Sequence, residues 1–164
     1  MRALIFGLVV IINFIIQASL FSYIEIFQVH PNTALLIVVA YAMLRGDVEG
    51  AIIGFTTGLM IDIVFGGLLG FYALIYAVAG FLCGKPFKDF IRENYLLPIV
   101  LTIASALVVE SLHFGAFYAL QGNTDFMRQL QERIIPATIY TNLFTLPVYF
   151  LVYRLNAKLE KHGY

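Results

Sequence analysis

The sequence predicts an all-α integral membrane protein with six transmembrane helices. Of its 164 residues, 61% are apolar and only 12% are charged, whereas an ordinary soluble domain has roughly 45–50% and about 25%. The apolar residues also fall into successive stretches, most of them near the roughly 20 residues that a helix needs to cross the hydrocarbon core. We therefore expect one polytopic membrane domain over residues 1–164.

Charge and cysteine content exclude several other classes of protein. Ten basic residues balance ten acidic ones, so the chain lacks the basic field that nucleic-acid binding requires. The single cysteine, Cys83, permits neither an intramolecular disulfide nor a thiolate zinc site. We also find no catalytic set of nucleophile and base and no phosphate-binding glycine loop. We therefore expect no enzyme activity, no metal and no cofactor.

Six spans are expected, and the second is the shortest. At about 1.5 Å per residue, 31–44 covers only about 21 Å of a hydrocarbon core about 30 Å thick. Pro98 stands in the first turn of the fifth span, where its missing N–H costs little. The spans are 3–24, 31–44, 48–65, 68–83, 96–120 and 134–155.

The distribution of basic residues predicts the orientation, because Lys and Arg are enriched on the cytoplasmic side of membrane proteins. With both termini inside, only Arg128 and Arg133 lie outside. Removing the second span would abolish this bias. The C-terminal tail, with Lys158 and Lys161, is expected to touch anionic head groups. The residues on the cytoplasmic side are Arg2, Arg45, Lys85, Lys88, Arg92, Arg154, Lys158 and Lys161.

Four glycines recur at intervals of four residues and predict a stripe along the third span. They are Gly46, Gly50, Gly54 and Gly58. Small residues in such a stripe let another backbone approach closely. The stripe is either a packing seam within the bundle, which we favour, or a docking face for another protein.

Polar residues from four different spans are expected at similar depths in the membrane. Glu110 and His113 are three residues apart, so they share a helix face and can interact. The group is either a set of interhelical hydrogen bonds, which we favour, or a pocket for a solute or lipid. A proton relay is a third hypothesis. Its members are Asn13, Gln17, Asp62, Glu110, His113 and Asn142.

A short helix is predicted on the outer surface, within 121–133. Residues 122–125 read Gly-Asn-Thr-Asp, a turn and N-cap signal, and Phe126, Leu130 and Ile134 follow at intervals of four. This segment is either a connector anchored in lipid or a contact, through Phe126 and Leu130, for an extracytoplasmic partner.

An ordered set of motifs in the first half of the chain resembles the rod shape-determining protein MreD family. Residues 17–20 are similar too, whereas 85–164 match in span number and hydropathy alone. Asn32 stands where the family favours Asp. The motifs are Pro31-Asn32, Leu44-Arg45-Gly46, Gly50-x-x-x-Gly54-Phe55-x-x-Gly58-Leu59-x-x-Asp62 and Leu69-Gly70-Phe71-x-Ala73-Leu74.

The resemblance implies a multi-pass protein of the bacterial inner (cytoplasmic) membrane that serves the cell-elongation machinery. It implies binding to the bitopic protein MreC, indirect association with RodA and a penicillin-binding protein, and MreB filaments beneath. The family's fold is similar to the substrate-binding subunits of energy-coupling-factor transporters, which also have six spans. No catalytic residue is implied.

Two hypotheses for function follow. The first is a non-enzymatic membrane scaffold that binds MreC and helps position or regulate peptidoglycan synthases. The alternative is the membrane-embedded substrate-binding subunit of a small-solute, vitamin-type transporter. The alternative lacks the alanine-x-x-x-alanine docking pattern in its first span. Its substrate contacts would be Asp62, Glu110, His113 and Asn142.

Overall fold

The computed structural model describes residues 31–65, 68–85, 96–119 and 126–161, with 7, 8, 10–13 and 15 near the N-terminus. Over these residues the protein is entirely helical, which confirms the all-α prediction. The expected first span lies mostly outside the described residues. The helices are α2 (Thr33–Arg45), α3 (Asp47–Phe65), α4 (Phe71–Gly84), α5 (Leu96–His113), α6 (Phe126–Gln129), α7 (Ile135–Leu143) and α8 (Thr145–Lys161).

Among the described helices, one is long and apolar enough to cross a membrane by itself. It comprises α5 and the start of the π-helical stretch that follows, Leu96–Ala116, 21 residues in all. The pair Leu130–Leu143 and Thr145–Lys158 would make a second span, although it is bent by 44°. Helices α2 and α4 are apolar but shorter. Six spans therefore remain a proposal.

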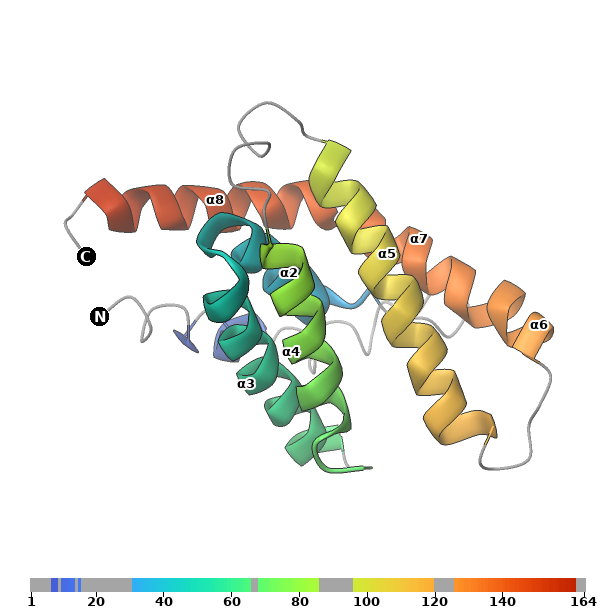
Figure 1. Cartoon of the computed structure of the whole chain (residues 1–164). Coiled ribbons are helices and arrows are strands. Elements are labelled where there is room, and N and C mark those ends of the chain that lie inside the picture. Colours follow the sequence, from blue (N-terminus) through green and yellow to red (C-terminus); the bar gives the residue numbers. More distant parts are fainter. Residues whose placement is uncertain are drawn as a thin grey trace.

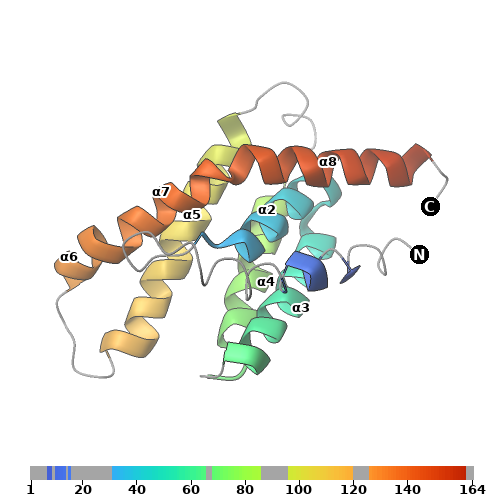
Figure 2. The same ribbon diagram turned by 180° about the vertical axis from the view of Figure 1, so that it is seen from behind.

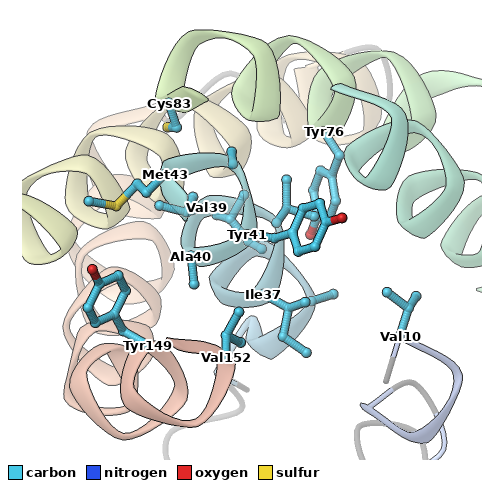
Figure 3. Close-up of a cluster of buried hydrophobic side chains, with 14 of the residues drawn as sticks. Val10, Ile37, Val39, Ala40, Tyr41, Met43, Tyr76, Cys83, Tyr149 and Val152 are labelled. Carbon is cyan, nitrogen blue, oxygen red and sulfur yellow. The ribbon is translucent and has the colours of Figure 1, made fainter. Parts of the chain in front are cut away.

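Helix α2 is the centre of the structure. Every residue from Thr33 to Met43 is buried, and the helix packs against α3, α4, α5 and α8 (Figures 1 and 2). A helix that is apolar on all sides is stable only where other helices or lipid surround it. Figure 3 shows Ile37, Ala40 and Met43 of α2 beside Tyr149 and Val152 of α8. This central position accounts for the short length of the second expected span.

Helices α3 and α4 form an antiparallel hairpin whose backbones touch. A methyl group added at Gly54 would collide with the carbonyl of Tyr76, and one added at Gly80 would collide with the carbonyl of Gly50. Gly58 meets the backbone of α4 in the same way. The glycine stripe of α3 therefore faces α4 inside the protein.

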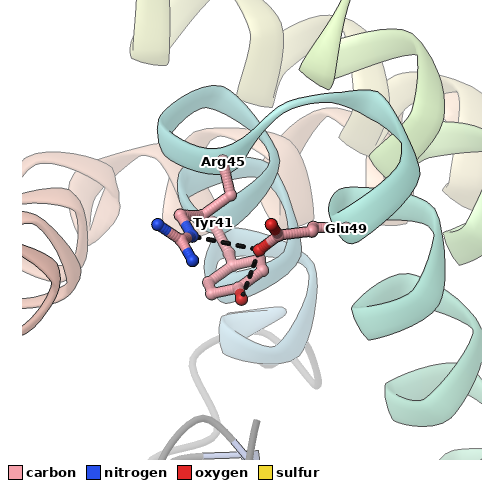
Figure 4. Close-up of polar contacts among 3 residues, drawn as sticks. All are labelled: Tyr41, Arg45 and Glu49. Atoms are coloured by element: carbon pink, nitrogen blue, oxygen red, sulfur yellow. Dashed lines mark hydrogen bonds and ion pairs between the residues drawn. The ribbon is translucent and has the colours of Figure 1, made fainter. Parts of the chain in front are cut away.

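Gly46 differs from the other glycines of the expected stripe. It lies in the turn between α2 and α3 with φ 104°, a left-handed conformation that glycine adopts without strain. The turn is tied by Glu49, whose Oε2 accepts hydrogen bonds from the Tyr41 hydroxyl (3.1 Å) and Arg45 Nε (3.0 Å) (Figure 4). Gly46 thus sets the direction of the chain into α3.

The expected span 134–155 is not one straight helix in the structure. Pro147 has no N–H, and its ring crowds the carbonyl of Leu143, so the helix breaks at Phe144 and α7 and α8 meet at 44°. Pro136 has the same effect on the preceding turn, where Leu130–Ile134 forms a π-helical stretch. Instead of an isolated outer helix, the chain is helical from Phe126 to Leu143.

We expect Gly54→Ala to lower the free energy of unfolding by about 1–3 kcal/mol, because the added methyl group forces the α3 and α4 backbones apart. The thermal midpoint of the purified protein in mild detergent measures this change. Gly115→Ala is the control, since a methyl group there meets nothing within 4 Å. Equal midpoints for the two variants would contradict the packing argument.

Candidate functional site

Asp62 caps the start of α4 from across the hairpin. Its side chain is buried, and its carboxylate oxygens accept the backbone N–H groups of Gly70 (3.1 Å), Tyr72 (3.1 Å) and Ala73 (3.0 Å). The first N–H groups of a helix have no partner within it and attract negative charge. Gly70 supplies the turn before α4, with φ 95°. These three hydrogen bonds from the protein itself satisfy the Asp62 carboxylate.

Two tyrosines of α4 extend this polar group to the neighbouring helices. The Tyr72 hydroxyl is hydrogen-bonded to Nδ1 of His113 on α5. The Tyr72 ring also lies edge-on to the rings of Tyr76 (5.8 Å between centroids) and His113 (5.6 Å). The interaction between Glu110 and His113 stays a prediction. The hydrogen bond between Tyr72 and His113 joins two helices, so residue spacing along one helix could not predict it.

Asn32 joins three helices at the start of α2. Its Oδ1 accepts the N–H of Leu35 (3.0 Å), which makes it the N-cap, and also accepts the hydroxyl of the buried Tyr76 (2.8 Å). Its own N–H donates to Oγ1 of Thr141 on α7 (3.0 Å). Asn32 stands where the family favours Asp, and its contacts with Tyr76 and Thr141 were not predicted from the sequence. The N-cap signal of Asn32 before an apolar run was readable.

Two charged residues, Glu110 and Arg133, lie near His113 and the other polar side chains described above. Glu110 is partly buried on α5, and Arg133 is exposed on the π-helical stretch before α7. Arg133 is near enough to act electrostatically on both Glu110 and His113. We name the polar cluster by its members: Asn32, Asp62, Tyr72, Tyr76, Glu110, His113, Arg133 and Thr141.

The remaining predicted polar residues are Asn13, Gln17 and Asn142, of which Asn13 and Asn142 are described. Asn142 makes its hydrogen bonds at the break between α7 and α8, donating to the carbonyl of Thr138 (3.1 Å) and accepting from Thr145 (3.4 Å). Asn13 is half-buried near the N-terminus. Gln17 lies outside the described residues. Of the six predicted residues, Asp62 and His113 are linked through Tyr72, and the convergence of the whole set stays a prediction.

The predicted outer contact belongs to the helical run that leads into α7. Phe126 begins α6, and Leu130 is half-buried at the start of the π-helical stretch. Arg128 and Glu132 form an exposed ion pair beside them, with Nε and Oε1 3.0 Å apart. Because Met127 is 66% exposed, the segment presents both an apolar and a charged surface.

The chemistry of the polar cluster is that of hydrogen bonds between helices. Asp62, Tyr72, Tyr76, Asn32 and Thr141 each bond to another part of the chain. Within the described residues, no three His, Cys, Asp or Glu side chains are placed to hold a metal ion. Such bonds hold helices in one arrangement.

Large apolar side chains are exposed on several helices, as in proteins that lie in lipid. The exposed fractions of Ile63 on α3, Leu74 on α4 and Leu143 on α7 are 66%, 66% and 71%. Together with the all-helical fold, this surface defines a membrane-associated helical protein. The chain belongs to the rod shape-determining protein MreD family, whose sequence profile matches residues 1–159.

The family match extends well beyond the motifs of 17–84 and includes the second half of the chain. Its description makes the protein one that determines rod shape. No curated protein and no solved structure gives a significant match.

We expect Asp62→Asn to destabilise the protein. An amide replaces one acceptor oxygen by an NH₂ group that faces the N–H donors of α4, and a hydrogen bond to a charged group contributes about 1.5–3 kcal/mol. The thermal midpoint should fall by several degrees. Glu132→Gln, in the exposed ion pair between Arg128 of α6 and the π-helical stretch that follows, is the control and should change little. A midpoint for Asp62→Asn equal to the control's would show that the cap is unimportant.

Asn32→Asp should be tolerated, because aspartate keeps the acceptor oxygen and favours a helix N-terminus. Asn32→Leu leaves the Leu35 N–H and the Tyr76 hydroxyl without their partner, at about 1–3 kcal/mol for each buried group. Thermal midpoints measure both. In the Asn32→Leu background, Tyr76→Phe should recover part of the loss; strict additivity of the two changes would refute the bond's importance.

Proposed function

We propose that the protein is a non-enzymatic scaffold subunit of the bacterial cell-elongation machinery. It binds an MreC-like bitopic protein and helps position or regulate peptidoglycan synthases, with RodA and a penicillin-binding protein associated indirectly and MreB beneath the membrane. Membership of the rod shape-determining family carries this proposal. The hydrogen bonds of the polar cluster, which join one helix to another, support the scaffold function.

A scaffold needs a fixed shape and exposed surface. Interhelical bonds occupy the side chains of Asp62, Tyr72 and Asn32, so these groups fix the positions of helices. The outward faces of α3 and α4 carry exposed apolar side chains such as Phe55 and Val78. In a membrane such faces contact lipid or the spans of partner proteins.

We further propose a single polytopic domain of six spans in the inner membrane, with both termini in the cytoplasm. Arg45 and Lys85 lie at the same end of the α3–α4 hairpin. Arg45 precedes Gly46 and Lys85 follows Gly84, and the backbones of these two glycines touch. Basic residues at one end of a bundle support a cytoplasmic location for that end. The fold of energy-coupling-factor binding subunits remains part of this proposal.

The second candidate is a substrate-binding subunit of a small-solute transporter. It is favoured by the charge of the partly buried Glu110 on α5, on which the exposed Arg133 acts electrostatically. Asp62 and Asn142, which it would use as substrate contacts, are already hydrogen-bonded to the protein. The transporter hypothesis therefore has fewer side chains available as substrate contacts than the sequence predicted.

Affinity purification of the tagged protein in mild detergent tests the two functions. We expect a single-span periplasmic protein and cell-wall synthases to co-purify. The double variant Phe126→Ala with Leu130→Ala should reduce recovery of the periplasmic protein severalfold, because it removes apolar surface from the outer segment. Arg128→Gln, in the same segment, is the matched control.

Recovery of an ATPase with a coupling membrane subunit would contradict the scaffold. Cells that lose a scaffold should round up whatever nutrients are supplied. Rescue of cell shape by an added vitamin would favour the transporter and direct attention to Glu110 and His113.

A further inference from the structure

Helix α8 runs across one end of the bundle. Figures 1 and 2 show it crossing near the turn from α2 to α3, while α3 and α4 extend away from that level. The bend of 44° after α7 produces this direction. An upright second half of a span would instead lie alongside the α3–α4 hairpin.

One face of α8 is anchored on the rest of the protein. Thr145, Tyr149, Val152 and Asn156 are spaced by three or four residues and are all buried. The helix packs against α2, and Figure 3 shows Tyr149 and Val152 directed toward that helix. The orientation of α8 about its own axis is therefore set by the protein.

The opposite face is apolar in its first turns and basic afterwards. Phe150 and Leu151 are 43% and 58% exposed, and Arg154 and Lys158 are exposed one turn apart on the same side. Tyr153 is 50% exposed beside this face, and its ring stacks on that of the buried Tyr149, with centroids 6.4 Å apart. Apolar, tyrosine and basic side chains in this combination are typical of a helix at the boundary between head groups and acyl chains.

The same end of the bundle carries further positive charge. Lys85 follows Gly84, whose backbone touches Gly46, and Arg45 is adjacent to that contact. The Lys85 ammonium lies 4.6 Å from the centre of the Phe81 ring. Arg45 is paired with Glu49 in that turn, so the cations that complement the negative surface of a leaflet with anionic phospholipids are Lys85, Arg154 and Lys158.

We propose that α8 lies in the plane of the cytoplasmic leaflet and that Arg154 and Lys158 bind the phosphate of anionic phospholipid head groups. The occupant is a lipid, because exposed apolar side chains adjoin the two cations on one face. The inference goes beyond the proposed scaffold and rests on it only for the assignment of this end to the cytoplasm. In this geometry the sixth crossing is the helical run from Phe126 to Leu143, about 27 Å long at about 1.5 Å per residue, and not 134–155.

Depth measurements separate this geometry from an upright helix. At about 1.5 Å per residue, an upright helix places Leu151 and Lys158 about 10 Å apart in depth. Single-cysteine variants Leu151→Cys and Lys158→Cys, in a Cys83→Ser background, carry a fluorophore that is quenched by lipids brominated at known depths. We expect depths within about 3 Å of each other. Val100→Cys and Val108→Cys on α5, both exposed, provide a pair that should differ by about 12 Å.

Lipid retention tests the head-group contact. In nanodiscs of phosphatidylglycerol and phosphatidylcholine, the purified protein should retain phosphatidylglycerol at severalfold excess by native mass spectrometry. Arg154→Gln and Lys158→Gln should each reduce this excess at least twofold. Arg128→Gln removes one exposed charge from α6 and should leave the excess of phosphatidylglycerol unchanged.

Three results would overturn the inference. The first is a depth difference near 10 Å between Leu151 and Lys158, and the second is equal retention of the two lipids. The third is labelling of Lys158→Cys in intact cells by a thiol reagent that cannot cross the membrane, which would place α8 outside and refute the proposed topology as well. The first two results would leave the scaffold function untouched.

Discussion

Direct contact between the backbones of α3 and α4 is the constraint on which the rest of the structure depends. Gly54 and Gly80 leave no room for a side chain at this contact. Because the two helices lie so close, the carboxylate of Asp62 reaches the N–H groups at the start of α4. The hairpin also fixes the side of α4 from which Tyr72 extends toward α5.

The buried helix α2 connects the α3–α4 hairpin to the helices of the second half of the chain. Asn32 at its start is bonded to Tyr76 of the hairpin and to Thr141 of α7. Its middle turns pack against α8. Among the buried side chains that the structure describes, the hydroxyl of Thr57 on α3 is the one polar group without a hydrogen-bond partner.

A membrane protein built in this way has a rigid interior and an apolar exterior. In lipid, an unpaired polar group is costly, so interhelical hydrogen bonds hold the helices in register while small residues allow them to touch. These properties are those of the chain that belongs to the rod shape-determining family. The bend before α8 turns this helix across one end of the bundle.

The sequence by itself determined the helical class, the family and the close approach at Gly50, Gly54 and Gly58, because composition and spacing along one helix are local properties. It identified Asp62 and His113 as buried polar groups but not their partners, since Tyr72 and the start of α4 come close only when the helices pack. It also did not anticipate the break at Phe144, although Pro147 was visible, because a proline can kink a span or end it. Only the tertiary structure decided where α8 points, since that direction depends on the packing of Tyr149 and Val152 against α2.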